Sequence, residues 1–132
     1  MQTPNTTILP ILWYNILSAK KQAEELRKEQ EMKRKVAFMF INAEIKEPRR
    51  VEMDLGQGFM AMVGVGSYEM ACQEAVKLTD EGFILLELCG GFGTIGHAKV
   101  TEAVQGRLQV GVVRFDNHPG YDNASGDSRW LK

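Results

Sequence analysis

Four apolar runs, separated by more polar segments, constrain the fold of this chain more than any other feature. They cover residues 36–41, 59–65, 83–89 and 110–115, are nearly continuous in apolar residues, and are rich in Val, Ile, Phe and Met. Strands of a parallel sheet have this composition because both of their faces are covered. We therefore expect four parallel strands at these positions.

The segment between the second and third runs has the features of a helix. Ser67 is a natural N-cap, and Gly82 suits the C′ position that follows a helix. An apolar stripe at helical spacing lies between them and contains Ala71, Ala75 and Leu78. The spacing predicts a helix over this segment.

Two further helices are expected in the other connections. Between the third and fourth runs, Thr94 can cap a helix and Gly106 can end it. In the first connection, Pro48 can open a shorter helix, Val51 and Leu55 form an i,i+4 apolar pair, and glycines follow at positions 56 and 58. Each strand is thus followed by a helix, except the last.

Alternating strands and helices predict an α/β fold. We expect a three-layer sandwich, with helices on both faces of a four-stranded, mostly parallel sheet of order 2-1-3-4, as in half of a Rossmann-like or flavodoxin-like fold. Ligands of such sheets bind beyond the carboxyl ends of the strands, where the strand order reverses. Here that position points to Asn42 and to residues 90–94.

The first 31 residues differ from the rest of the chain. The apolar run 8–17 is shorter than the roughly 20 residues of a spanning helix, and no basic residue precedes it as in a signal peptide. A solvated helix is expected from 18 to 35. Residues 1–31 are then either an upstream mis-start or dispensable extension of one domain, 32–132, or an arm whose Trp13 and Tyr14 pack on a second subunit of a homodimer.

Composition excludes several classes of partner. The chain has 132 residues, the length of one domain, and Lys+Arg 16 against Asp+Glu 17 give a net charge of −1. Neither nucleic acid nor an acidic membrane is therefore an expected partner. Cys72 and Cys89 are too few for a disulfide framework, and free cysteines fit a reducing compartment. We expect a cytoplasmic protein.

A glycine-rich loop follows the third apolar run. Residues 91–96 read Gly-Phe-Gly-Thr-Ile-Gly and match G-x-G-x-x-G between a strand and a helix. Backbone N–H groups and the positive helix end attract an anion there, which predicts a phosphate- or carboxylate-bearing ligand on Gly90, Gly91, Phe92, Gly93 and Thr94.

A nucleotide is a less favoured ligand for the same loop. Asp116 lies twenty positions after Gly96, where the dinucleotide fingerprint has an acid for the ribose. Only one strand follows the loop, however, so a whole dinucleotide would lack half of its binding platform. A third interpretation gives the glycines no ligand, and only a tight turn and close packing.

Polar residues near the strand ends supply the remaining candidates. If the third and fourth strands end level, Glu87 and Arg114 stand side by side, and a structural ion pair is favoured over a catalytic one. Arg114 would otherwise hold the ligand's anionic group, with Asp116 and His118 contacting its polar remainder. Catalytic candidates are Cys89 as nucleophile, His118 as acid or base, and Glu87. No spacing predicts a metal site.

Two sequence blocks resemble a known family. The first is Glu87-Leu88-Cys89-Gly90-Gly91-Phe92-Gly93, and the second runs from 111 to 127 with Arg114-Phe115-Asp116, His118-Pro119-Gly120 and Ser125-Gly126-Asp127. They are similar to short prokaryotic proteins catalogued only as a domain of unknown function. The resemblance covers Lys33 to about Asp127, favours a start near the first strand, and implies no activity.

Three interpretations therefore remain. The leading one is a domain that binds a small anionic molecule at the switch point. The second is a small enzyme that uses Cys89 or His118 at the same place. The third is a structural domain that forms a homo-oligomer through its sheet edge and N-terminal arm and has no ligand.

Overall fold

The computed structural model describes residues 8–131, so the first seven residues of the expected N-terminal extension, and Lys132, lie outside it. The chain divides into two units, with the boundary between Lys33 and Arg34. We describe each unit by itself.

The first unit contains one helix, α1 (Ile8–Met32), which includes both the apolar run and the charged segment. Pro10 lies in its first turn, where a missing N–H costs little. An i,i+4 ion pair forms within it, with Lys28 Nζ 3.1 Å from Glu24 Oε1. Eight large apolar side chains are exposed: Leu9, Ile11, Leu12, Trp13, Tyr14, Ile16, Leu17 and Leu26. No helix in the described residues is long and apolar enough to cross a membrane.

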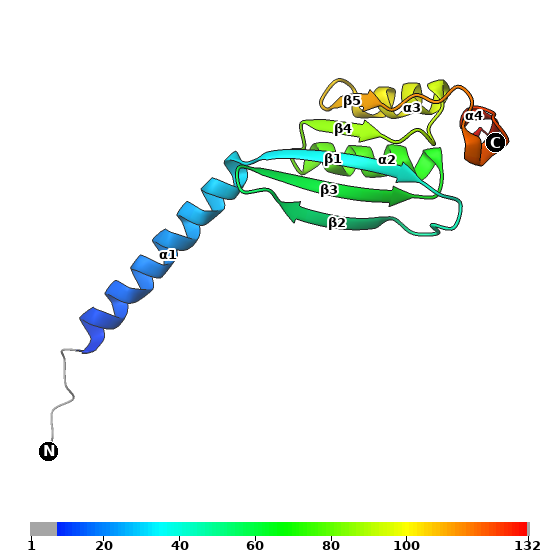
Figure 1. Cartoon of the computed structure of the whole chain (residues 1–132). Helices are drawn as coiled ribbons and strands as arrows, with labels where there is room; N and C mark the ends of the chain where they lie inside the picture. Colours follow the sequence, from blue (N-terminus) through cyan, green and yellow to red (C-terminus); the bar gives the residue numbers. More distant parts are fainter. Residues whose placement is uncertain (1–7, 132) are drawn as a thin grey trace, which may run out of the picture. The chain divides into compact units, whose positions relative to one another are not determined.

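The second unit is built on a five-stranded sheet of order β2-β3-β1-β4-β5 (Figure 1). Its strands are β1 (Arg34–Ile41), β2 (Arg49–Asp54), β3 (Gly58–Val65), β4 (Leu85–Leu88) and β5 (Gln109–Val112). The four expected strands correspond to β1, β3, β4 and β5, which are parallel and lie in the expected order. The α/β class is thus confirmed, although β4 and β5 are shorter than their apolar runs.

The prediction of a helix after Pro48 is wrong, because the residues that follow Pro48 form the edge strand β2. This strand pairs antiparallel with β3 through a hairpin, in which Gly56 has a φ of +79° and its N–H donates to Asp54 Oδ1 at 2.8 Å. Val51 and Met53 alternate with the charged residues Arg50 and Glu52, so the period-2 pattern of a strand prevails over the single i,i+4 pair.

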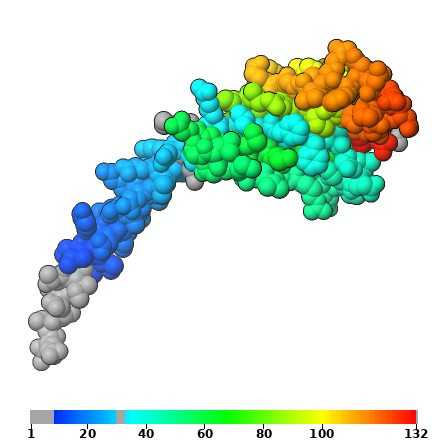
Figure 2. Space-filling model, in the orientation of Figure 1, coloured from blue at the N-terminus to red at the C-terminus, as the bar shows by residue number. Residues whose placement is uncertain are grey.

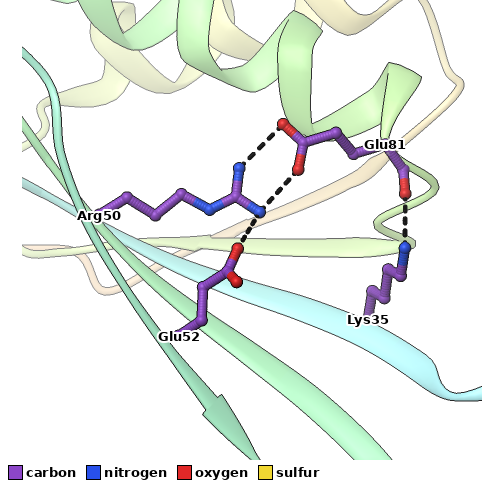
Figure 3. Close-up of polar contacts among 4 residues, drawn as sticks. All are labelled: Lys35, Arg50, Glu52 and Glu81. Carbon is purple, nitrogen blue, oxygen red and sulfur yellow. Dashed lines mark hydrogen bonds and ion pairs between the residues drawn. The ribbon is translucent and has the colours of Figure 1, made fainter. Parts of the chain in front are cut away.

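Salt bridges attach β2 to the end of the next helix, α2 (Tyr68–Asp80) (Figure 3). The Arg50 guanidinium donates to Glu81 Oε1 at 2.9 Å, lies 2.6 Å from Glu81 Oε2, and also pairs with Glu52. Lys35 Nζ donates to the Glu81 backbone oxygen at 3.0 Å. The bidentate geometry fixes the edge strand against the helical layer.

The helices begin and end near the expected residues. Ser67 caps α2, since its Oγ accepts from the Met70 N–H at 3.1 Å, and Gly82 follows with a φ of +84°. Helix α3 (Thr94–Val104) has Gly93, rather than Thr94, as its N-cap, and no side-chain hydrogen bond from that residue. A short 3-10 helix, η1 (Pro119–Tyr121), and α4 (Asp127–Trp130) follow β5.

The core of the second unit lies between one face of the sheet and the helices α2 and α3. Helices α2 and α3 pack against each other, and they cover strand side chains that are almost fully buried, among them Met39, Val63 and Leu88. These side chains share one face, because their positions are paired in the strand register.

The opposite face of the sheet is not covered by a helix of residues 34–131. We call it the open face; its apolar side chains are half-buried or exposed and comprise Val36, Phe38, Phe40, Val51, Met53, Met60, Met62 and Leu85. The helix expected after Pro48 would have covered this face, and β2 extends the sheet instead.

Candidate functional site

The glycine loop lies where expected, between the carboxyl end of β4 and the start of α3. The C-terminal segment, which contains Gly126 to Trp130, packs directly on this loop. A Cβ atom added at Gly93 would lie 2.3 Å from Asp127 Cγ, and one added at Gly126 would lie 2.1 Å from the Gly91 carbonyl oxygen. The glycines at these two positions therefore permit a close approach between two distant parts of the chain.

Asp127 occupies the N-terminus of α3. The Ile95 N–H donates to its Oδ2 at 2.9 Å, and the Gly96 N–H donates to its Oδ1 at 3.0 Å. A carboxylate is favourable here because the first N–H groups lack helical partners and the helix dipole is positive at this end. The anion position that the loop sequence predicts is thus held by a carboxylate of the chain itself.

Tyr68, the first residue of α2, joins this arrangement. Its hydroxyl donates to Asp127 Oδ1 at 2.9 Å and accepts from the Gly93 N–H at 2.9 Å. Burial raises the pKa of Tyr68 well above its usual value, and the adjacent Asp127 carboxylate adds to the effect. The ring also stacks on Phe92, with centroids 5.6 Å apart.

The rest of the C-terminal segment is fixed by aromatic contacts. Trp130 Nε1–H donates to the Gly91 carbonyl oxygen at 3.0 Å. The Arg129 guanidinium lies over the rings of Tyr121 and Trp130, 5.3 and 5.4 Å from their centroids. These contacts hold α4 beside the glycine loop.

A cleft of about 990 Å³ lies between the starts of α2 and α4 and the adjoining face of α3. Two basic side chains line it, Lys99 and Arg129, and within residues 8–131 neither forms an ion pair with a carboxylate. Two acidic residues, Glu69 and Glu102, also line it. Cys72 is the cysteine in the cleft, and burial raises the pKa of its thiol.

The expected binding residues do not all gather at one place. Of residues 90–94, Gly93 contacts a cleft residue, since its N–H donates to the Tyr68 hydroxyl at 2.9 Å. Asn42 lies in the turn after β1, next to the lining residue Ala43, and its Oδ1 accepts from the Glu44 N–H at 2.9 Å. Arg114 and Asp116 pair with each other at 2.8 Å on the surface after β5. None of these side chains lines the cleft.

The catalytic candidates also have other partners. Cys89 Sγ accepts from the Gly91 N–H at 3.4 Å, and the side chain packs on the core. His118 Nδ1 accepts from the Gly120 N–H at 3.1 Å, and its ring stacks on Tyr121, with centroids 4.2 Å apart. Neither residue lines the cleft.

The ion pair expected between Glu87 and Arg114 is not formed. Glu87 lies opposite Gly111 in the register of β4 and β5, on the open face. Arg114 lies beyond the end of β5, and its Nε donates to Asp116 instead. The prediction failed because β4 and β5 end level at Leu88 and Val112, which places Glu87 opposite Gly111 and leaves Arg114 beyond the strand.

Sequence reasoning missed Tyr68, Lys99 and Arg129, because each lies in an ordinary helical pattern with no local sign of a site. Asp127 did have a signal, since it stands in one of the two sequence blocks that resemble other proteins. The structure brings those blocks together through Gly91, Gly93, Gly126 and Asp127. In the described part of the chain, no three His, Cys, Asp or Glu residues are grouped to hold a metal ion.

Comparison with known proteins identifies a family. The model of a family of unknown function, DUF6506, matches residues 34–128, which include the sheet, the glycine loop and Asp127. No curated protein and no solved structure matches the chain.

Proposed function

We propose that this chain, which belongs to the family of unknown function DUF6506, binds a small phosphate- or carboxylate-bearing molecule in the cleft between α2, α3 and α4. One observation carries the proposal. Lys99 and Arg129 come from different elements into one cleft of about 990 Å³, and neither is neutralised by a carboxylate partner within residues 8–131. Two such cations in a concave site favour an anionic ligand.

The cleft is a better site than the loop amides themselves. A ligand at the start of α3 would compete with Asp127, which is attached to the chain and already accepts from the Ile95 and Gly96 N–H groups. The loop amides instead hold the C-terminal segment, and that segment carries Arg129 and Trp130 into the cleft wall. The glycine loop thus contributes to binding indirectly, by positioning α4.

Different lining residues would contact different groups of the ligand. Lys99 supplies a mobile point charge, whereas Arg129 is held over two rings and can donate in a fixed plane. The start of α2 adds the positive end of a helix dipole at Ser67 and Tyr68. Glu69 and Glu102 would accept from hydroxyl or amino groups on the same ligand.

A thermal-shift screen of the full chain tests the proposal. The probes are inorganic phosphate, citrate, sugar phosphates and nucleotides. A ligand present at a hundred times its Kd adds about 2.7 kcal/mol to the free energy of unfolding. In a domain of this size, each kcal/mol raises the Tm by roughly 4 to 8 °C. We expect at least one probe to raise the Tm by several degrees.

Matched variants locate the site. Lys99→Gln should abolish most of the shift, whereas Arg114→Gln should leave it unchanged, because Arg114 pairs with Asp116 outside the cleft. The opposite pattern would place the ligand at the edge of the sheet after β5 and would contradict the cleft. A screen in which no probe raises the Tm would count against a small anionic ligand altogether.

A further inference from the structure

We propose that the open face of the sheet binds the open face of a second copy of this chain, to form a two-fold symmetric dimer with two stacked sheets. This inference is independent of the ligand cleft, because the cleft lies among α2, α3 and α4, and these elements do not cover the open face. The argument rests on the exposure, shape, size and charge of that face.

Exposure separates the two faces of the same strands. On β3, Ala61 and Val63 are 0% and 1% exposed, whereas Met62 between them is 42% exposed. On the neighbouring edge strand, Val51 and Met53 are 69% and 53% exposed. Figure 2 shows side chains of the cyan and green segments, which include β1 to β3, at the surface. A contiguous apolar surface of this kind marks an interaction site.

A glycine in β3 lets neighbouring side chains lie close to the sheet on the open face. At Gly64, an added Cβ atom would lie 2.7 Å from Cζ of Phe40 and 2.9 Å from Cδ1 of Ile45, so the glycine makes room for both side chains. Phe40 and Gly64 are paired in the register of β1 and β3. Flat apolar sheet faces pack about 10 Å apart with their side chains interdigitated.

The size of the face fits a weak dimer. Strands lie about 4.8 Å apart and rise about 3.3 Å per residue, so β2, β3, β1 and β4, which carry the apolar side chains of the open face, together present roughly 400 Å² of area. Two copies together would remove on the order of 800 Å² from water, which is within the range of small, transient interfaces. A second copy supplies this area without any other partner.

Two charged residues on the open face favour a particular symmetry. Arg49 lies on β2, at one side of the apolar surface, and Glu87 lies on β4, at the other side. Neither forms an ion pair within the described residues. In the strand register, Arg49 lies level with Gly64 and Glu87 lies level with Phe38, an offset of about 7 Å along the strands.

A two-fold axis parallel to the strands, between β3 and β1, would place β4 of one copy over β2 of the other. This arrangement brings Glu87 of each copy within reach of Arg49 on its partner, because an Arg side chain spans the offset. The face is then self-complementary in charge as well as apolar at its centre, as a two-fold interface requires.

The first test is the mass of the full chain by size-exclusion chromatography with light scattering. We expect a dimer, which Met62→Lys dissociates by placing a charge at the centre of the open face. Leu12→Lys on α1 is the control, because Leu12 is also exposed and apolar but lies outside this unit. A monomeric wild type, or a dimer lost in Leu12→Lys and retained in Met62→Lys, would overturn the proposal.

The second test addresses the symmetry by charge reversal. Glu87→Arg should raise the dimer Kd about tenfold or more, because it places like charges together in the interface. The double variant Arg49→Glu/Glu87→Arg should restore a Kd close to that of the wild type. Both residues are exposed, so neither change should unfold the domain. A double variant no tighter than Glu87→Arg alone would exclude this pairing.

Discussion

The Tyr68 hydroxyl donates a hydrogen bond to Asp127 Oδ1 at 2.9 Å, which joins the start of α2 to the C-terminal segment. The same carboxylate accepts from the Ile95 and Gly96 N–H groups at the start of α3. The Asp127 side chain therefore connects α2, α3 and α4 around the cleft, and its removal should weaken the packing of all three.

Asp127→Ala should lower the free energy of unfolding by about 2 kcal/mol, because it removes a helix cap and leaves the Ile95 and Gly96 N–H groups without this acceptor. Urea denaturation measures the change. Asp116→Ala is the control: its carboxylate is exposed and pairs with the equally exposed Arg114, so we expect a change within about 0.5 kcal/mol. Equal losses in the two variants would contradict the capping role.

Gly93→Ala should destabilise the domain by about 1 to 3 kcal/mol, because the new Cβ atom would collide with the Asp127 carboxylate. Gly111→Ala is the matched control, since a Cβ atom added there meets nothing within 4 Å. The cost of Gly93→Ala should shrink in an Asp127→Ala background, where the colliding atoms are gone. An undiminished cost would show that the glycine is needed for another reason.

Tyr68 should make stability fall at high pH. Because burial raises its pKa in the folded state, the folded protein resists ionisation of this phenol. Its contribution is complete below the unfolded pKa of about 10 and is lost as the pH rises above that value. Urea denaturation at a series of alkaline pH values should therefore show a steeper loss for the wild type than for Tyr68→Phe; parallel curves would contradict the assignment.

Glu81 gives an acid dependence of the opposite sign. The hydrogen bond from Arg50 lowers the pKa of Glu81 in the folded state. Its contribution is therefore present above the unfolded pKa of about 4.3 and is lost as the pH falls below it. Arg50→Gln should flatten the stability profile in this acid range. Arg107→Gln, which breaks the exposed pair with Asp80, is the control and should leave the profile of the wild type.

Much of the fold was predictable because local patterns specify it. The apolar runs identified four strands and their order, and Ser67 and Gly82 marked the ends of α2. The segment after Pro48 was ambiguous, since Val51 and Leu55 fit a helix while Val51 and Met53 fit a strand. Pairing with β3 decides between them, and that pairing is not local.

The candidate site was less predictable because it depends on contacts between distant residues. The glycine loop predicted an anion at the start of α3. The sequence did not indicate that Asp127, 32 residues after Ile95, would supply that anion. Lys99 and Arg129 lie in separate helices, and only the packing of α3 and α4 brings both to one cleft. The wrong prediction of an ion pair between Glu87 and Arg114 has the same origin, because pairing with β4 sets where β5 ends.

Ligand-induced shifts of backbone amide resonances test whether a small anionic molecule binds in the cleft between α2, α3 and α4. The full chain, labelled with nitrogen-15, would be titrated with the probe that gives the largest thermal shift. Binding in the cleft predicts saturable shifts at Ser67, Tyr68, Lys99 and Arg129, and none at Arg114 to His118. Shifts confined to the segment from Arg114 to His118, or an absence of saturable shifts with every probe, would contradict it.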